Sequence, residues 1–486
     1  MSGLSRRGRR AGVVVLAAGV ILSPVFTAPA QAQARTIEWR ACTDAEFIGM
    51  QCGTMRVPVE WAKPRGAQVD LALVRRPASD PARRQGTLLL NNGAGRSAVE
   101  QLRFAMRSGF PELAGAMAQR FDIVAIDPRG VGHSAPVRCA VPIKPEGVTH
   151  FPKDRAAFSR LAEHNRAFAQ DCLRRNGPLV ANVDATSTAR DFEALRVNLG
   201  ERQLNWYGIM HSTLLGRTYA TLFPGRLRTL NADTALDDTG SPLDQALGEA
   251  SAAEDSFNRF AAWCTTDDKC ALKGRDVGVE YDALVARADR EPIPVEAGRK
   301  MTGEDIREAT QDYLNLAAFT WPRLAEAIVK AQGGDASGFA TTPDRTLDPV
   351  QAQVSGCLDT PRQIRTFKQA ERARQALRAR SPHLGGAVSG WANLIGCVGW
   401  PVGGKAVRAG GEIPDAPRAL VVQSTHQAHA PHAAGQAFAE QFRGSLVLGR
   451  EGDDYSMILS SRCVREATNR YLTDLVLPAP GTVCAD

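Results

Sequence analysis

Three features that would point to a metal centre, nucleic acid or a lipid bilayer are missing from this 486-residue chain. None of its ten cysteines forms a Cys-x-x-Cys pair, the spacing typical of structural zinc sites. Its net charge of +7 falls to +3 without Arg6, Arg7, Arg9 and Arg10, so charge does not favour nucleic acid or an anionic membrane. The apolar run 11–26 is short and contains a proline, which disfavours a permanent membrane span. We expect no cofactor, no nucleic-acid partner and no stable membrane span.

Residues 1–34 have the layout of a signal peptide. A basic segment precedes the apolar run, and Ala30, Ala32 and Ala34 offer small-residue cleavage sites. This predicts a secreted, extracellular protein, and the paired arginines leave both general and twin-arginine export open. The remaining chain is long enough, at 44% apolar residues, for one large domain with an insertion. We expect a monomer.

The even number of cysteines fits disulfide bonding in an oxidising compartment. Their order along the chain suggests local pairs, although sequence alone does not fix the connectivity. The suggested pairs are Cys42–Cys52, Cys139–Cys172, Cys264–Cys270, Cys357–Cys397 and Cys463–Cys484.

Short apolar strands alternate with helices up to about residue 238, which predicts a mostly parallel sheet covered on both faces. The pattern then becomes helical, and strand-like segments return near 419 and 445. The predicted organisation is a core formed by 35–238 and 411–486, with a helical lid inserted at 239–410. Lids at this position cover the site edge of such sheets.

The stretch 205–216 is the centre of this organisation. It passes from an apolar strand through Gly208 directly into a helix, as in the strand–turn–helix that presents a catalytic serine in Gly-x-Ser-x-Gly. Here Met210 stands at the serine position and Ser212 at the closing glycine. A thioether cannot lose a proton or form an acyl intermediate, so the usual covalent route is closed at its first step.

Several segments of the chain together resemble the secreted tripeptidyl aminopeptidase-like branch of the α/β-hydrolases, which are serine peptidases related to proline iminopeptidase. The segments are CGTMRVPVEW at 52–61, FDIVAIDPRGVGHSAPVRC at 121–139, NWYG at 205–208, YATLFPGR at 219–226 and LPAPGTVC at 477–484. The resemblance implies the α/β-hydrolase fold, the lid and an ancestry in peptide or ester hydrolysis. It does not by itself establish present activity.

The positions that carry the family's triad differ in this sequence. The resemblance places Met210 at the serine, Gln427 at the acid and Asp453 or Asp454 at the histidine. The corresponding oxyanion loop contains Asn92, Gly93, Ala94 and Gly95, followed by Arg96 and Ala98 where the family has glycines. We therefore expect the family's serine mechanism to be absent.

Histidines and aspartates gather on the same loops and offer other chemistry. They are His211 and Ser212 at the turn, His426, His429 and His432 in the former acid loop, and Asp453 and Asp454 in the former histidine loop. One hypothesis is an acid–base pair, with a loop histidine oriented by one of these aspartates. Ser212 as a displaced nucleophile and a His/Asp metal site are alternatives, and solvated loop side chains are the simplest interpretation of any single histidine.

Three functions follow from these residues. The first is a divergent enzyme that uses His211, His429 and Asp454 for acid–base chemistry on a small molecule, such as elimination, isomerisation, cyclisation or hydrolysis. The second is an inactive descendant that binds a peptide or a small hydrophobic ligand under the lid. The third is a conventional aminopeptidase or esterase with a displaced triad.

Overall fold

The computed structural model describes Gly3 and residues 37–91, 93, 95–107, 115–145, 147–295, 298–340, 347–403, 407, 410–455, 458 and 460–486. The predicted signal peptide thus lies outside the described residues, apart from Gly3. Ala34–Asp486 forms one compact unit.

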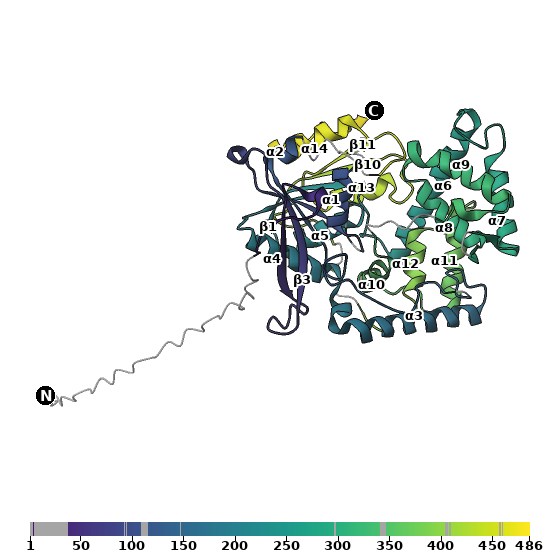
Figure 1. Ribbon diagram of the computed structural model, residues 1–486, viewed down its shortest axis with the longest axis horizontal. Coiled ribbons are helices and arrows are strands. Elements are labelled where there is room, and N and C mark those ends of the chain that lie inside the picture. The colour runs from purple at the N-terminus through teal and green to yellow at the C-terminus, as the bar shows by residue number, and fades with distance from the viewer. Residues whose placement is uncertain are drawn as a thin grey trace. The chain divides into compact units, whose positions relative to one another are not determined.

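A ten-stranded sheet runs through the core in the order β1-β2-β3-β5-β4-β6-β7-β10-β11-β12 (Figure 1). β2 pairs antiparallel with β1 and β3, β3 pairs antiparallel with β5, and every other pairing in the sheet is parallel. The strands are β1 (Arg40–Ala41), β2 (Gln51–Pro58), β3 (Gln68–Arg76), β4 (Thr87–Asn91), β5 (Asp122–Ile126), β6 (Leu204–Ile209), β7 (Leu227–Asp233), β10 (Ala419–Ser424), β11 (Leu446–Arg450) and β12 (Val483–Cys484). This confirms the predicted α/β-hydrolase fold class.

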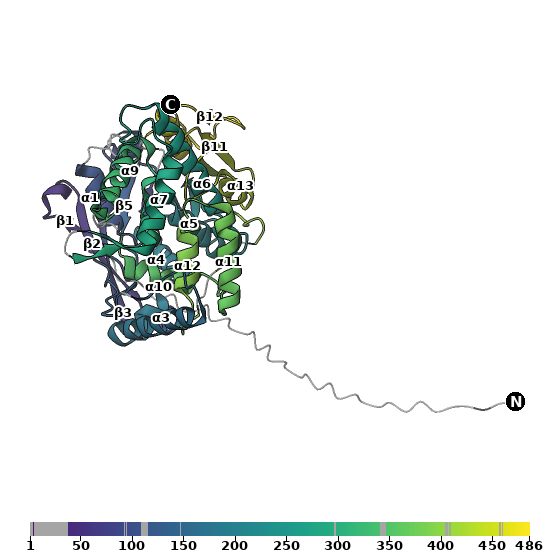
Figure 2. The ribbon, with the colours of Figure 1, turned by 90° about the vertical axis from the view of Figure 1, so that its right-hand side faces the viewer.

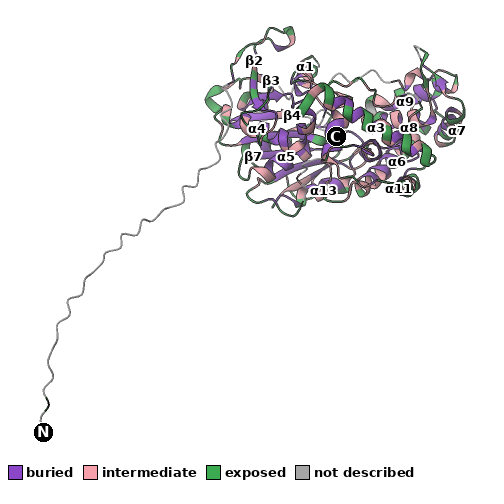
Figure 3. Ribbon diagram, turned by 90° about the horizontal axis from the view of Figure 1, so that it is seen from below, coloured by how far each residue is buried: buried purple, intermediate pink, exposed green. Residues whose placement is uncertain are grey.

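The burial of the strands follows their place in the sheet. β5 and β10, which lie inside the sheet, are buried along their whole length, as expected for strands covered on both faces. Figure 3 shows the neighbouring β4 and β7 to be mostly buried as well. The β2–β3 hairpin alternates buried and more exposed residues, because one of its faces meets the core. The sequence periodicity predicted both patterns.

Helices cover both faces of the sheet. α3, α4, α5 and α13 contribute to one hydrophobic cluster with the central strands, and α1, α2 and α14 contribute to clusters with other residues of the same strands. The helices of the core are α1 (Ala98–Arg107), α2 (Ala116–Arg120), α3 (Arg155–Asn176), α4 (Ala185–Asn198), α5 (His211–Leu222), α13 (His432–Glu440) and α14 (Arg462–Asp474).

The insertion between β7 and β10 is mostly helical, as Figure 2 shows. It has a hydrophobic cluster of its own. Phe158 and Leu161 of α3 and Ala428 of the core also belong to that cluster, so the lid core extends beyond the predicted segment 239–410. Its elements are α6 (Pro242–Thr266), α7 (Val277–Arg290), β8 (Ile293–Pro294), β9 (Lys300–Met301), α8 (Gly303–Tyr313), α9 (Ala317–Gln332), α10 (Pro349–Asp359), α11 (Phe367–Arg380) and α12 (Ser389–Gly396).

All ten cysteines form the five local disulfides suggested by their order. Cys357–Cys397 joins α10 to the end of α12 within the lid, and Cys463–Cys484 ties α14 to β12. Five disulfides fit an extracellular protein. Within the described residues, no helix has both the length and the apolar character needed to cross a membrane.

Candidate functional site

Met210 sits at a strained turn between β6 and α5. Its backbone has φ 50° and ψ −117°, a region that side-chain-bearing residues rarely adopt. Its N–H donates to Asp233 O at 3.1 Å, and its carbonyl accepts from Thr213 N at 2.8 Å and Thr213 Oγ1 at 2.6 Å. The surrounding strands therefore hold the geometry of a nucleophile elbow around a methionine.

Gly208, two residues before Met210, leaves no room for a side chain. A Cβ atom on Gly208 would lie 2.7 Å from Trp206 Nε1 and 2.9 Å from Ser212 Oγ. Ser212 is fully buried against this strand, and its Oγ has no hydrogen-bond partner. Ser212 is not among the residues that line the cavity described next, so its position gives no support to the alternative of a displaced nucleophile.

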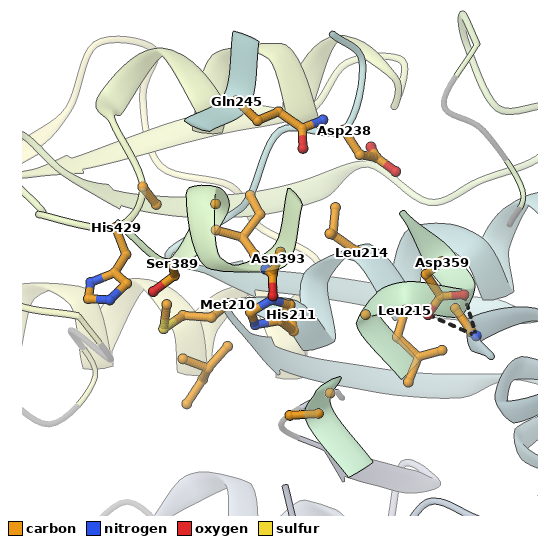
Figure 4. Close-up of a pocket in the computed structure, with 18 of the residues that line it drawn as sticks. Met210, His211, Leu214, Leu215, Asp238, Gln245, Asp359, Ser389, Asn393 and His429 are labelled. Atoms are coloured by element: carbon orange, nitrogen blue, oxygen red, sulfur yellow. Dashed lines mark hydrogen bonds between the residues drawn. The ribbon is translucent and has the colours of Figure 1, made fainter. Parts of the chain in front are cut away.

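A cavity of about 1870 Å³ opens beside the elbow, between the carboxyl end of the sheet and the lid. Met210, His211 and His429 line it, and Figure 4 shows Met210 between the two imidazoles. Ser389 and Asn393 of lid helix α12 line the same cavity and are drawn in the same view. His211 and His429, two of the predicted site residues, thus lie at the edge of the sheet where α/β folds build sites.

His429 is held by a lid amide and not by an aspartate. Its Nδ1 lies 2.6 Å from Asn315 Oδ1, which also accepts from Gln427 Nε2 at 2.7 Å. An amide oxygen is only an acceptor, so the neutral His429 carries its proton on Nδ1. Gln427, at the predicted acid position, accepts hydrogen bonds through its Oε1 from the backbone N–H groups of His429 and Ala430, at 2.6 and 2.7 Å.

Both cavity histidines are held neutral by their surroundings. Burial and then the charge of Arg96 lower the pKa of His211 to about 4, although its ring still touches the open interior of the cavity. Burial, followed by His211 and Arg96, lowers the pKa of His429 to about 4. Burial is thus the larger cause of both shifts, and the cation of Arg96 adds to it.

The other predicted residues of these loops bind elsewhere. His426 Nδ1 lies 2.7 Å from Asp255 Oδ2 of α6, and Asp453 accepts two hydrogen bonds from Arg259 of the same helix. Asp454 lies 3.6 Å from Arg450 Nη1, and burial raises the pKa of its carboxyl. The predicted histidine–aspartate pair is thus replaced by His429–Asn315, and Asp453 and Asp454 are not among the residues that line the cavity.

The metal alternative is not supported by the described residues. The one group of three potential ligands found there within 4.8 Å of one another is Cys463, Cys484 and Asp486, whose cysteines form a disulfide. His432 begins α13, and its Nδ1 is buried without a hydrogen-bond partner. The predicted cluster of loop histidines and aspartates around an ion is therefore not formed.

The former oxyanion loop packs directly on the elbow. A Cβ atom on Gly93 would lie 2.6 Å from His211 Cβ, and one on Gly95 would lie 2.6 Å from Ala352 Cβ of α10. Both glycines have positive φ, so the loop depends on them for its path as well as for space. Asn92 and Ala94, the other two predicted loop residues, lie outside the described residues.

Two further cavity carboxyls escaped the sequence analysis. Burial raises the pKa of Glu249 and of Asp359 to about 7 each. Glu249 accepts from the N–H groups of Ser389 and Gly390 at the start of α12, and Asp359 accepts from Ala185 N at the start of α4 (Figure 4). No short motif marks them, because their role comes from helix ends that are distant in sequence.

Comparison with known proteins agrees with this geometry. A model of the alpha/beta hydrolase fold matches residues 86–284, and a model of TAP-like protein matches residues 382–484. The chain is a TAP-like α/β-hydrolase. It is 29% identical to a tripeptidyl aminopeptidase of Streptomyces coelicolor over 94% of this chain and 87% of that protein.

Two mycobacterial relatives match this TAP-like chain over similar lengths. The serine protease Hip1 of Mycobacterium tuberculosis H37Rv is 27% identical over 92% of this chain and 91% of its own. Carboxylesterase B of the same strain is 29% identical over 92% of this chain and 89% of its own. The chain is thus an α/β-hydrolase of the peptidase and esterase type.

Solved structures to which this chain is similar include an esterase from Thermogutta terrifontis, with TM-score 0.36 and 12% identity over 90% of this chain and 97% of that one. The proline iminopeptidase of Mycobacterium smegmatis matches with TM-score 0.33 and 14% identity, over 87% of this chain and 99% of that one.

Proposed function

We propose that this secreted TAP-like protein binds a ligand in the cavity beside Met210 and does not use a serine mechanism. The observation that carries the proposal is the elbow itself, where a methionine occupies the strained position that presents a nucleophile in this fold. The thioether lines the cavity and offers contact area, but no group that attacks a carbonyl.

The electrostatics at the elbow also disfavour proton abstraction. A general base must become positively charged as it takes a proton, and its neighbours determine the free energy of that charge. Around His429 the neighbours are the neutral amide of Asn315, the cation of Arg96 and a second imidazole. A carboxylate partner would favour the imidazolium strongly, whereas the amide oxygen of Asn315 carries no charge to do so, and Arg96 and His211 oppose it.

The loops that the resemblance assigns to the acid and the base now hold the lid. Asp453 binds Arg259, His426 binds Asp255, and Gln427 binds Asn315. The backbone of Tyr455 donates to Asn315 O at 3.2 Å as well. Contacts of this kind support retention of a closed, preformed cavity, which favours binding.

A second function has one observation in its favour. Because Asn315 fixes the proton of His429 on Nδ1, Nε2 of this cavity residue is left as a hydrogen-bond acceptor. Such an imidazole is suited to activate water without a covalent intermediate, although its low pKa makes it a weak base at neutral pH.

One experiment separates the two functions and the serine route. The purified protein is incubated with p-nitrophenyl esters and amino-acid p-nitroanilides of graded size, and in parallel with a fluorophosphonate probe. We expect no labelling, and no turnover above that of the His429→Gln variant. Turnover lost in His429→Gln without labelling would establish the second function, and labelling of the wild type would restore a serine hydrolase.

A further inference from the structure

Lid helix α11 carries a high concentration of positive charge. The segment 362–380, which contains α11, holds seven arginine and lysine side chains and a single acidic one, Glu371. The basic residues are Arg362, Arg365, Lys368, Arg372, Arg374, Arg378 and Arg380. The net charge of the whole chain is only +7, so cations and acids nearly balance over the remaining residues. The positive charge is therefore gathered on this one element.

The fold presents these cations to solvent. The helix buries one stripe of apolar side chains in the lid cluster, namely Ala370, Ala373 and Leu377. Because an α-helix has about 3.6 residues per turn, Lys368 and Arg372 lie on the side opposite this stripe, and both are exposed, as is Arg365. Among the residues that the structure describes, no carboxylate pairs with any of these three side chains.

The helix gains no stability from cations at these positions. A helix N-terminus favours negative charge, yet Arg365 and Lys368 flank Thr366, the N-cap of α11. Lys368 and Arg372 are four residues apart, a spacing at which like charges repel each other. Farther along, burial and then the charges of two neighbouring arginines lower the pKa of Arg378. An anion from outside the chain would relieve this repulsion.

The basic surface continues onto helix α3. Phe367 of α11 packs against Phe158 of α3 with ring centroids 6.4 Å apart, and the two helices lie side by side in Figures 1 and 2. Arg155 and Arg160, in the turns on either side of Phe158, are exposed. The same stretch also holds two acidic residues, Asp154 and Glu163. Helix α11 is therefore the centre of the surface, and α3 extends it.

The chemistry of this surface fits a linear phosphate polymer better than a lipid bilayer. None of the exposed large apolar side chains in the described part of the chain belongs to α3 or to 362–380, so no apolar anchor for a membrane is present there. Most of the cations are arginines, whose planar guanidinium binds phosphate through two parallel hydrogen bonds. They follow the helix axis over about 20 Å, at about 1.5 Å per residue.

We propose that α11 binds a linear polymer of phosphate groups, with Arg365, Lys368 and Arg372 as the central contacts and Arg155 of α3 beside them. This interaction goes beyond the proposed function, because it attaches the protein to a polymer while the cavity binds a separate ligand. It is electrostatic, since each contact releases counterions from the polymer.

The test is biolayer interferometry of the purified protein on immobilised long-chain polyphosphate. We expect saturable binding whose affinity falls at least tenfold between about 50 and 200 mM salt. Orthophosphate at the same total phosphate concentration should not compete, because it cannot bridge several cations. Phosphatidylglycerol vesicles that bind as tightly as the polymer would make the surface a membrane site and overturn the inference.

Variants then locate the polymer. Arg365→Gln/Lys368→Gln/Arg372→Gln removes three exposed cations and should weaken binding at least tenfold and reduce its salt dependence. Glu371→Gln, which removes the one acidic side chain of the segment, should strengthen binding about twofold to threefold. A damaged fold would not produce that gain. Wild-type affinity in the triple variant would show that the assignment is wrong.

The matched control removes the same charge from the core. Arg40→Gln/Arg65→Gln/Arg226→Gln alters three exposed arginines outside α3 and α11 and should keep the polyphosphate affinity within about twofold. An equal loss in both triple variants would mean that net charge alone is sensed, which contradicts a site on α11. His429→Gln, in the cavity, should leave polyphosphate binding unchanged, so the two proposals can fail separately.

Discussion

Arg259 of lid helix α6 binds Asp453 of the core through two hydrogen bonds, Nε to Oδ1 at 2.8 Å and Nη2 to Oδ2 at 3.0 Å. The aspartate side chain is 6% exposed and the arginine 37%. A planar, two-point contact of this kind fixes orientation as well as charge. The loop that the resemblance assigns to the catalytic histidine thus anchors the lid.

Loss of Arg259 should loosen that anchor. Arg259→Gln leaves the buried Asp453 carboxylate without its cation, and we expect a loss of about 1–3 kcal/mol of local stability, below the value for a fully buried pair because Arg259 is partly exposed. Hydrogen exchange should accelerate in α6 and in 451–455 and stay unchanged in α14. Arg443→Gln, which breaks the exposed Arg443–Glu412 pair, is the control. Equal protection in both variants would contradict the anchoring role.

The strained backbone at Met210 should reveal itself in a pair of variants. Met210→Gly and Met210→Ala both remove the thioether, but only glycine adopts φ 50° at little cost. We expect the glycine variant to be more stable by about 1 kcal/mol in chemical denaturation. At Leu214, which lies inside α5, the alanine variant should instead be the more stable of the two, because glycine disfavours a helix interior. Equal stability of Met210→Ala and Met210→Gly would mean that the turn relaxes and that its backbone is not strained.

A serine placed at the elbow should not restore hydrolysis. Met210→Ser supplies the missing nucleophile, but activation still needs a base that can accept its proton and become charged. Burial, His211 and Arg96 disfavour a charged His429, and Asn315 supplies no carboxylate to offset them. We therefore expect fluorophosphonate labelling no faster than in Met210→Ala. Rapid labelling that disappears in Met210→Ser/His429→Gln would show that His429 is a competent base.

The sequence predicted the fold closely because its evidence is local. Apolar periodicity locates β4, β5 and β6, and the direct passage from β6 into α5 locates the elbow at Met210. The disulfide pairs could be suggested for the same reason, since each joins cysteines that are neighbours in cysteine order.

The site was predicted only in part because its contacts join distant segments. His211 and His429 could be placed on the cavity from the ends of the strands that precede them. Their partners could not, because Asn315 and Arg259 come from the lid, where sequence gives helices but not which side chain meets the core. Asp453 and Asp454 were the natural candidates for partners of the histidines. In the structure Asp453 pairs with Arg259 of the lid and Asp454 with Arg450 of the core.

The depressed pKa of His429 gives a pH dependence with a definite sign. In the unfolded chain its imidazole takes a proton near pH 6.5, whereas in the folded protein it does so only near pH 4. Below pH 6.5 the unfolded state therefore binds more protons, so this residue stabilises the fold above that pH and its contribution is lost as the pH falls from about 6.5 to 4.

The measurement is the difference in unfolding free energy between the wild type and His429→Gln, taken at pH 7.5, 6.0 and 4.5. Glu249 and Asp359, whose raised pKa values make stability fall as the pH rises through the same range, are present in both proteins and cancel in the difference. We expect the wild type to lose about 1–2 kcal/mol relative to the variant between pH 7.5 and 4.5, less than the full shift because the ring touches the open cavity. A difference that stays constant with pH would mean that burial and the neighbouring groups do not lower the pKa of His429, and the electrostatic argument against a base at this position would then fail.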